Sequence, residues 1–223
     1  MSSPPAGQLP PLTLVLGGAR SGKSRFAEAL VEGAARCGTY CATAEAKDDE
    51  MAARIAAHRA HRGAFWHTIE APLAVADAII TASHPERPLL VDCLTLWLSN
   101  LLMAEAPIED EFARLRTSLR EAAGPVVLVA NEVGLGLVPQ TPLGRHFRDA
   151  AGRLNQDIAL LADRVVFIAA GLPLVLKDSP HPSLPRLRGR VIATPSPAVP
   201  PPFPSPQAGE GQGGGGGGSG WGL

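Results

Sequence analysis

The chain has 223 residues, 45% of them hydrophobic, and its 20 Lys and Arg against 21 Asp and Glu leave a formal net charge of −1. This balance excludes the broad basic field of a nucleic-acid-binding surface, so we expect no nucleic-acid partner. No apolar run approaches the roughly 20 residues that cross a bilayer, and the first ten residues do not resemble a signal peptide. Three cysteines without metal-ligand spacing fit a reducing compartment, and we predict a cytoplasmic protein.

Composition divides the chain into a flexible leader (1–11), a nucleotide-binding domain (12–177) and a disordered tail rich in Pro and Gly (178–223). Continuous apolar runs predict strands, and helical periodicity predicts helices. In chain order we predict strand 12–16, helix 24–36, strand 39–43, helices 48–62 and 73–82, strand 88–92, helices 94–103 and 109–122, strand 126–130, helix 143–162, and strands 164–169 and 172–176. This alternation predicts an α/β fold with a mostly parallel sheet, flanked by helices and closed by a terminal antiparallel hairpin.

The turn between the first strand and the first helix fits the phosphate-binding loop pattern. It reads Gly17-Gly18-Ala19-Arg20-Ser21-Gly22-Lys23-Ser24. Glycines let the backbone N–H groups turn toward an anion, and the helix N-terminus adds a positive partial charge. Lys23 can reach the outer phosphates, and the Ser24 hydroxyl can ligate Mg²⁺. These eight residues therefore predict binding of a nucleoside triphosphate.

Asp92 ends an apolar strand, at the position where phosphate-loop proteins carry a carboxylate that holds Mg²⁺. We predict that Asp92 and Ser24 together form the metal site. The alternative is that Asp92 only caps the helix predicted from residue 94.

The predicted helix 48–62 opens with three acidic residues and closes with basic ones, as the helix dipole favours. Arg54, His58 and either His61 or Arg62 follow at helical spacing and could gather around a phosphate. Cationic neighbours disfavour the imidazolium, which would keep His58 neutral and nucleophilic. The alternative is that His58 is a solvated residue near a charged helix end.

Seven segments together resemble one family, the bifunctional adenosylcobinamide kinases and adenosylcobinamide-phosphate guanylyltransferases of cobalamin synthesis. They are Gly-Gly-Ala-Arg-Ser-Gly-Lys-Ser at 17–24, Tyr-Cys-Ala-Thr at 40–43, Asp-Glu-Met-Ala-Ala-Arg-Ile-Ala-Ala-His at 49–58, Trp-His-Thr-Ile-Glu at 66–70, Asp-Cys-Leu-Thr at 92–95, Asn-Glu-Val-Gly at 131–134, and Arg-His-Phe-Arg-Asp-Ala-Ala-Gly-Arg-Leu-Asn-Gln at 145–156. The resemblance covers nearly all of residues 12–177.

The resemblance implies two reactions and their site residues. ATP or GTP phosphorylates adenosylcobinamide, and GMP from GTP then passes through a guanylyl-histidine to adenosylcobinamide phosphate, giving adenosylcobinamide-GDP. It implies a RecA-like sheet, Mg²⁺ and a homotrimer, with Lys23 and His58 as catalytic residues. Beyond the loop, the implied nucleotide contacts are Ala42, Thr43, Ala44, Arg59, Ala60, His61, Arg62, Glu70 and Asp92. Two alternatives stay open: a phosphate-loop kinase without guanylylation, and a nucleotide-dependent regulatory ATPase that acts on a protein partner.

Overall fold

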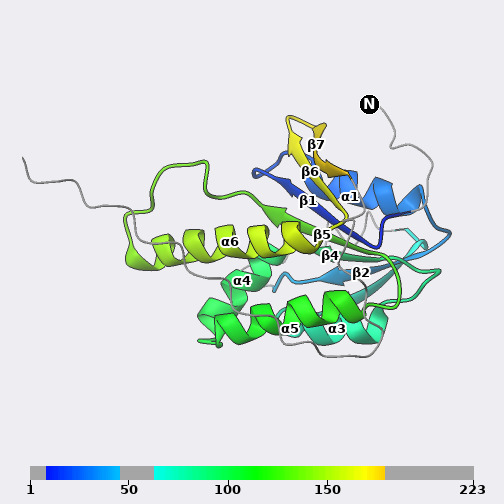
Figure 1. The fold of residues 1–223 in the computed structure, drawn as a ribbon, viewed down its shortest axis with the longest axis horizontal. Helices are drawn as coiled ribbons and strands as arrows, with labels where there is room; N and C mark the ends of the chain where they lie inside the picture. The colour runs from blue at the N-terminus through cyan, green and yellow to red at the C-terminus, as the bar shows by residue number, and fades with distance from the viewer. Residues whose placement is uncertain (1–8, 46–62, 179–223) are drawn as a thin grey trace, which may run out of the picture. The chain divides into compact units, whose positions relative to one another are not determined.

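The computed structural model describes residues 9–45 and 63–178, which build a domain around one twisted sheet (Figure 1). The strands are β1 (Leu12–Gly17), β2 (Gly38–Ala42), β3 (Trp66–Glu70), β4 (Leu89–Asp92), β5 (Val126–Asn131), β6 (Arg164–Ala169) and β7 (Leu172–Asp178). They lie in the order β3-β2-β4-β5-β1-β6-β7. All neighbouring pairs are parallel except the hairpin of β6 and β7. The predicted fold class, an α/β phosphate-loop domain with a mostly parallel sheet and a terminal antiparallel hairpin, is confirmed.

Helices cover both faces of this sheet. Those in the described ranges are α1 (Lys23–Glu32), α3 (Val75–Ala82), α4 (Leu94–Met103), α5 (Ile108–Glu121) and α6 (Pro142–Leu161). Helices α3 to α6 pack against one face and α1 against the other (Figure 1). Consecutive residues of one strand therefore enter different cores. Leu14 of β1 packs in the core beneath α3 to α6, and Val15 packs in the core beneath α1. Burial on both faces explains why these strands are continuously apolar. No helix of the described ranges is long and apolar enough to span a membrane.

The clearest difference from the sequence prediction is β3, since no strand was expected at Trp66–Glu70. It pairs with β2 on one side only and forms an edge of the sheet in the described part of the chain, so His67 and Glu70 stay exposed. An edge strand needs no continuous apolar run, which is why the pattern missed it. Helix α1 also ends four residues before the predicted position 36. The helix predicted at 48–62 lies outside the described residues.

Residues just outside the predicted domain boundaries, 12 and 177, also contact the folded domain. Leu9 is buried in the core shared with α1. The Pro11 carbonyl accepts a hydrogen bond from the Val126 N–H at 3.0 Å. At the other end, Asp178 of β7 pairs with Arg164 of β6 at 3.0 Å. Residues 9–11, placed in the predicted leader, therefore pack on the sheet.

Candidate functional site

The phosphate loop connects β1 to α1 through a turn that glycine makes possible. A Cβ on Gly17 would lie 2.6 Å from the Ile168 carbonyl oxygen of β6, and Gly22 has a φ of 95° where α1 begins. The Gly171 N–H of the β6–β7 turn donates to the Ser21 carbonyl at 2.9 Å, so the terminal hairpin braces the loop. Lys23 Nζ donates to the Gly18 carbonyl at 3.3 Å. The lysine thus folds over the loop whose backbone would cradle the phosphates.

We expect Gly17→Ala to lower the free energy of unfolding by about 1–3 kcal/mol, because the added methyl group must displace the backbone of β6. The matched control is Gly18→Ala, since a Cβ on Gly18 meets no atom within 4 Å. That control should change stability by no more than about 0.5 kcal/mol. Urea denaturation of both variants measures the difference. Equal stability of the two variants would show that β6 does not pack this closely on the loop.

The structure brings together Ser24 and Asp92, the predicted metal pair. Ser24 is in the first turn of α1, and Asp92 ends β4, which β5 separates from β1. Ser24 Oγ donates to Asp92 Oδ1 at 3.2 Å. The other carboxylate oxygen, Oδ2, accepts a hydrogen bond of 2.5 Å from the Tyr40 hydroxyl. The alternative prediction, that Asp92 caps the following helix, is wrong, because the N-cap residue of α4 is Cys93 and no side chain caps this helix.

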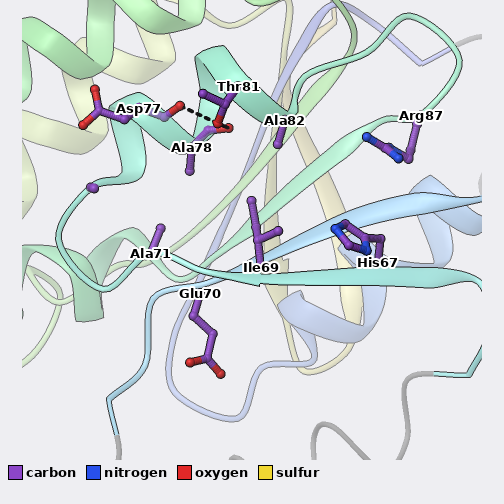
Figure 2. Close-up of a pocket in the computed structure, with 10 residues that line it drawn as sticks. His67, Ile69, Glu70, Ala71, Asp77, Ala78, Thr81, Ala82 and Arg87 are labelled. Carbon is purple, nitrogen blue, oxygen red and sulfur yellow. Dashed lines mark hydrogen bonds between the residues drawn. The ribbon is translucent and has the colours of Figure 1, made fainter.

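Three predicted nucleotide contacts stand in one row at the carboxyl ends of adjacent strands. Ala42 of β2 is in register with Glu70 on one side and with Asp92 on the other. The Glu70 side chain projects from β3 on the side opposite Ile69 and His67 (Figure 2). Ligands of open α/β sheets bind at this edge. The row therefore lies at the same edge of the sheet at which the phosphate loop leaves β1.

Thr43, the next predicted contact, is fully buried, and its hydroxyl serves the protein backbone. Its Oγ1 donates to the Cys93 carbonyl and accepts from the Cys93 N–H, both at 2.8 Å. The Thr43 carbonyl accepts from Asn100 of α4 at 2.8 Å. Thr43 thus links the end of β2 to the end of β4, next to Asp92. Ala44, the following predicted contact, is half-buried. His58, Arg59, Ala60, His61 and Arg62 lie outside the described residues.

A polar cluster that lies outside the predicted site residues anchors the chain where β5 ends. Asn131 is in register with Gly17, and its N–H donates to Thr95 Oγ1 of α4 at 2.7 Å. Asn155 of α6 donates to the Asn131 carbonyl at 3.2 Å, and the Glu132 N–H donates to the Gly17 carbonyl at 3.1 Å. The signal in the sequence was a polar pair directly after an apolar strand. Through Asn131 the cluster ties α4 and α6 to β5, and the Glu132 N–H joins the end of β5 to Gly17, where the phosphate loop begins.

One cavity of the described residues lies away from the phosphate loop. It has a volume of about 430 Å³ and lies between β3 and α3 (Figure 2). Its lining is His67, Ile69, Glu70, Ala71, Ala74, Asp77, Ala78, Thr81, Ala82 and Arg87. No loop residue is among them, and α3 packs on the opposite face of the sheet from α1. The cavity is therefore separate from the phosphate loop, and only Glu70 belongs to both it and the predicted nucleotide contacts.

The buried cysteines next to the site are poor nucleophiles. Burial raises the pKa of Cys41 from 9.0 to about 12. Burial, and then the charge of the adjacent Asp92, raise the pKa of Cys93. Both thiols are therefore protonated at neutral pH and poorly nucleophilic.

Iodoacetamide at pH 8 should modify Cys37 alone in the native protein and all three cysteines after denaturation. Cys37 is exposed, whereas Cys41 and Cys93 are buried. At a pKa near 12, only about one Cys41 thiol in 10,000 is ionised at this pH, and raising the pH to 9 increases that fraction about tenfold. Peptide mass mapping of native and denatured samples, with Cys37→Ser as the control, checks this result. Rapid native modification of Cys41 or Cys93 would contradict the packing beside Asp92.

The cobinamide kinase / cobinamide phosphate guanyltransferase family matches residues 13–176. A "bifunctional adenosylcobalamin biosynthesis protein CobP" of Pseudomonas aeruginosa is 50% identical over 169 residues, covering 75% of this chain and 98% of the relative. A "bifunctional adenosylcobalamin biosynthesis protein CobU" of Salmonella typhimurium is 43% identical over 182 residues, covering 74% and 99%. Among solved structures, the flagellar accessory protein FlaH of Methanocaldococcus jannaschii has a TM-score of 0.44 at 14% identity, covering 78% of this chain and 81% of that one. The chain belongs to the cobinamide kinase / cobinamide phosphate guanyltransferase family.

Proposed function

We propose that this protein phosphorylates adenosylcobinamide with ATP or GTP and then converts the product, with GTP, into adenosylcobinamide-GDP. The observation that carries the proposal is the Ser24–Asp92 pair of hydroxyl and carboxylate, 3.2 Å apart at the phosphate loop, in a chain of this family. The relatives with 50% and 43% identity are both named as bifunctional proteins of adenosylcobalamin biosynthesis.

For the kinase step, the hydroxyl oxygen of the aminopropanol arm attacks the γ-phosphorus, the bond to the bridging oxygen breaks, and the nucleoside diphosphate leaves. Such a reaction requires positioning and charge neutralisation rather than covalent help from the protein. The loop N–H groups and Lys23 would hold the β- and γ-phosphates and stabilise the charge that moves onto the leaving group.

Oxygen atoms of Ser24 and Asp92 would hold Mg²⁺ together with the phosphates. Hydroxyl and carboxylate oxygens are the hard ligands that this ion prefers, and the two side chains already meet in the structure. When bound, Mg²⁺ supplies further neutralisation of phosphate charge. The described residues contain no cluster of three His, Cys, Asp or Glu that would suit a transition metal.

For the guanylyl step, a neutral nitrogen of His58 attacks the α-phosphorus of GTP, and pyrophosphate leaves. A phosphate oxygen of adenosylcobinamide phosphate then attacks the same phosphorus, the bond to His58 breaks, and adenosylcobinamide-GDP is released. The covalent intermediate divides one difficult transfer into two easier ones. The support for His58 is its position in the sequence, three residues after the Arg54-Ile55 pair.

The decisive assay incubates the protein with adenosylcobinamide, ATP, GTP and Mg²⁺, and resolves the corrinoids by liquid chromatography and mass spectrometry. The proposal predicts adenosylcobinamide phosphate first and adenosylcobinamide-GDP later. The phosphate as sole product would leave a kinase without guanylylation. ATP hydrolysis with neither corrinoid product would favour the regulatory ATPase.

We also propose that the protein is a homotrimer. On β7, which ends the sheet within the described residues, Leu172, Leu174 and Leu176 are 71%, 58% and 57% exposed. Exposed apolar side chains concentrated on one element suit burial against another copy of the chain. Light scattering coupled to size-exclusion chromatography should give three times the monomer mass, and a monomeric mass at micromolar concentration would contradict this assembly.

A further inference from the structure

We propose that Tyr40 is a positioning residue of the phosphoryl-transfer site, whose hydroxyl fixes the carboxylate of Asp92 in the orientation that serves Ser24 and the metal. The inference rests on the proposed function, since that gives Ser24 and Asp92 their metal. Two hydroxyl groups hold the carboxylate, one on each oxygen. Tyr40 donates to Oδ2 at 2.5 Å and Ser24 donates to Oδ1 at 3.2 Å.

The strand register brings the phenol to this carboxylate. Asp92 is level with Ala42, two residues after Tyr40 on the neighbouring strand β2. Residues two apart share a face, so Tyr40, Ala42 and Asp92 all project toward the α1 side, where Ser24 lies. Two strand residues span about 6.6 Å. A phenol bridges this gap, whereas the hydroxyl of a serine or threonine at position 40 would stop short of Asp92.

The Tyr40 ring is held rigidly. Its residue is 1% exposed, and it packs against Trp66 of β3 with ring centroids 5.6 Å apart at an angle of 87°. Trp66 Nε1 in turn donates to Glu32 at the end of α1 at 2.9 Å. Contacts from β2, β3 and α1 therefore fix where the hydroxyl points before any nucleotide arrives. Rigid support of this kind keeps an active-site group close to its productive geometry.

A fixed Asp92 matters because of what Ser24 must do. A serine oxygen that ligates a metal directs its lone pair at the ion, and its proton then needs an acceptor. Asp92 Oδ1 is that acceptor in the structure. Without Tyr40 the carboxylate could rotate about its terminal torsion, which is broad and soft. Loss of partners that orient metal ligands typically costs about 10- to 100-fold in metal affinity or activity.

The test compares Tyr40→Phe with Thr39→Val. The first variant removes the hydroxyl that bonds Asp92, whereas the second removes a buried hydroxyl of the same strand for which the described residues supply no hydrogen-bond partner. The probe is Mn²⁺ with a non-hydrolysable ATP analogue, and free Mn²⁺ is measured by electron paramagnetic resonance. We expect Tyr40→Phe to weaken Mn²⁺ binding about tenfold, with analogue affinity in EDTA unchanged, and Thr39→Val to bind Mn²⁺ like the unmodified protein. Mn²⁺ binding by Tyr40→Phe equal to that of the unmodified protein would overturn the proposal.

A second measurement serves if Tyr40→Phe does not fold. Tyr40 is the single tyrosine of the chain, so growth on 3-fluorotyrosine labels this position alone. The ¹⁹F resonance should move when Mg²⁺ is added to the analogue-bound protein, and Asp92→Asn should abolish the movement. A ¹⁹F resonance whose position does not change when Mg²⁺ is added would refute the positioning role of Tyr40. Neither readout needs the corrinoid, so failure of the proposed function would show separately, as missing corrinoid products in the unmodified protein.

Discussion

Replacing Lys23 with alanine should abolish both phosphoryl transfer and guanylyl transfer. Lys23 is the first residue of α1, and its ammonium group lies 3.3 Å from the Gly18 carbonyl of the loop. From there it can exchange that carbonyl for the phosphates of either nucleotide. We expect kcat/KM of each reaction to fall at least about 100-fold, equivalent to roughly 2.7 kcal/mol of transition-state stabilisation.

The matched control is Arg25→Ala, which removes the same charge from an exposed position two residues further along α1. Its activities should stay within about threefold of the unmodified protein, because exposed charges are screened by solvent and salt. Assays of nucleoside diphosphate release and of labelled GMP incorporation measure the two steps separately. Guanylylation that survives in Lys23→Ala would mean that the two reactions use different nucleotide sites.

Replacing His58 with alanine should separate the two activities. The variant should form adenosylcobinamide phosphate at a rate close to that of the unmodified protein, because phosphoryl transfer needs no covalent intermediate. It should form no adenosylcobinamide-GDP, because the nitrogen that carries GMP is gone. Chromatography of the corrinoids after incubation with both nucleotides measures the two products.

His61→Ala is the matched control for this second prediction, since it removes the other imidazole of the same predicted helix. It should retain guanylylation, although its affinity for GTP can change because His61 is a predicted nucleotide contact. Normal adenosylcobinamide-GDP formation by His58→Ala, with loss in His61→Ala, would assign the nucleophile to His61 instead.

Local sequence was sufficient to predict the strand, loop and helix that surround the phosphate-loop pattern. The pattern is contiguous, so its glycines, Lys23 and Ser24 could be proposed as site residues from spacing alone, and the structure confirms that the loop joins β1 to α1. Asp92 could be proposed because it ends an apolar strand, and the structure places it 3.2 Å from Ser24. Strands buried on both faces, such as β1 and β5, are continuously apolar and were predicted within one residue at each end.

Features that depend on partners distant in the chain could not be predicted in this way. The hydrogen bond of Tyr40 to Asp92 joins residues 52 positions apart, and it depends on the pairing of β2 with β4. Thr43 was predicted as a nucleotide contact, but its hydroxyl is occupied by the Cys93 backbone, a pairing that only the folded sheet creates. Edge strand β3 lacks the apolar run that marks the central strands, because its exposed residues need not be hydrophobic.

Mass spectrometry of the protein after incubation with GTP and Mg²⁺, without any corrinoid, tests the central claim most directly. The two-step account predicts a gain in intact mass of one guanylyl group, stable in base and labile in acid, and located on His58 after proteolysis. Addition of adenosylcobinamide phosphate should then discharge the group. A protein that makes adenosylcobinamide-GDP while never carrying the adduct, or that carries it on another residue, would contradict the account.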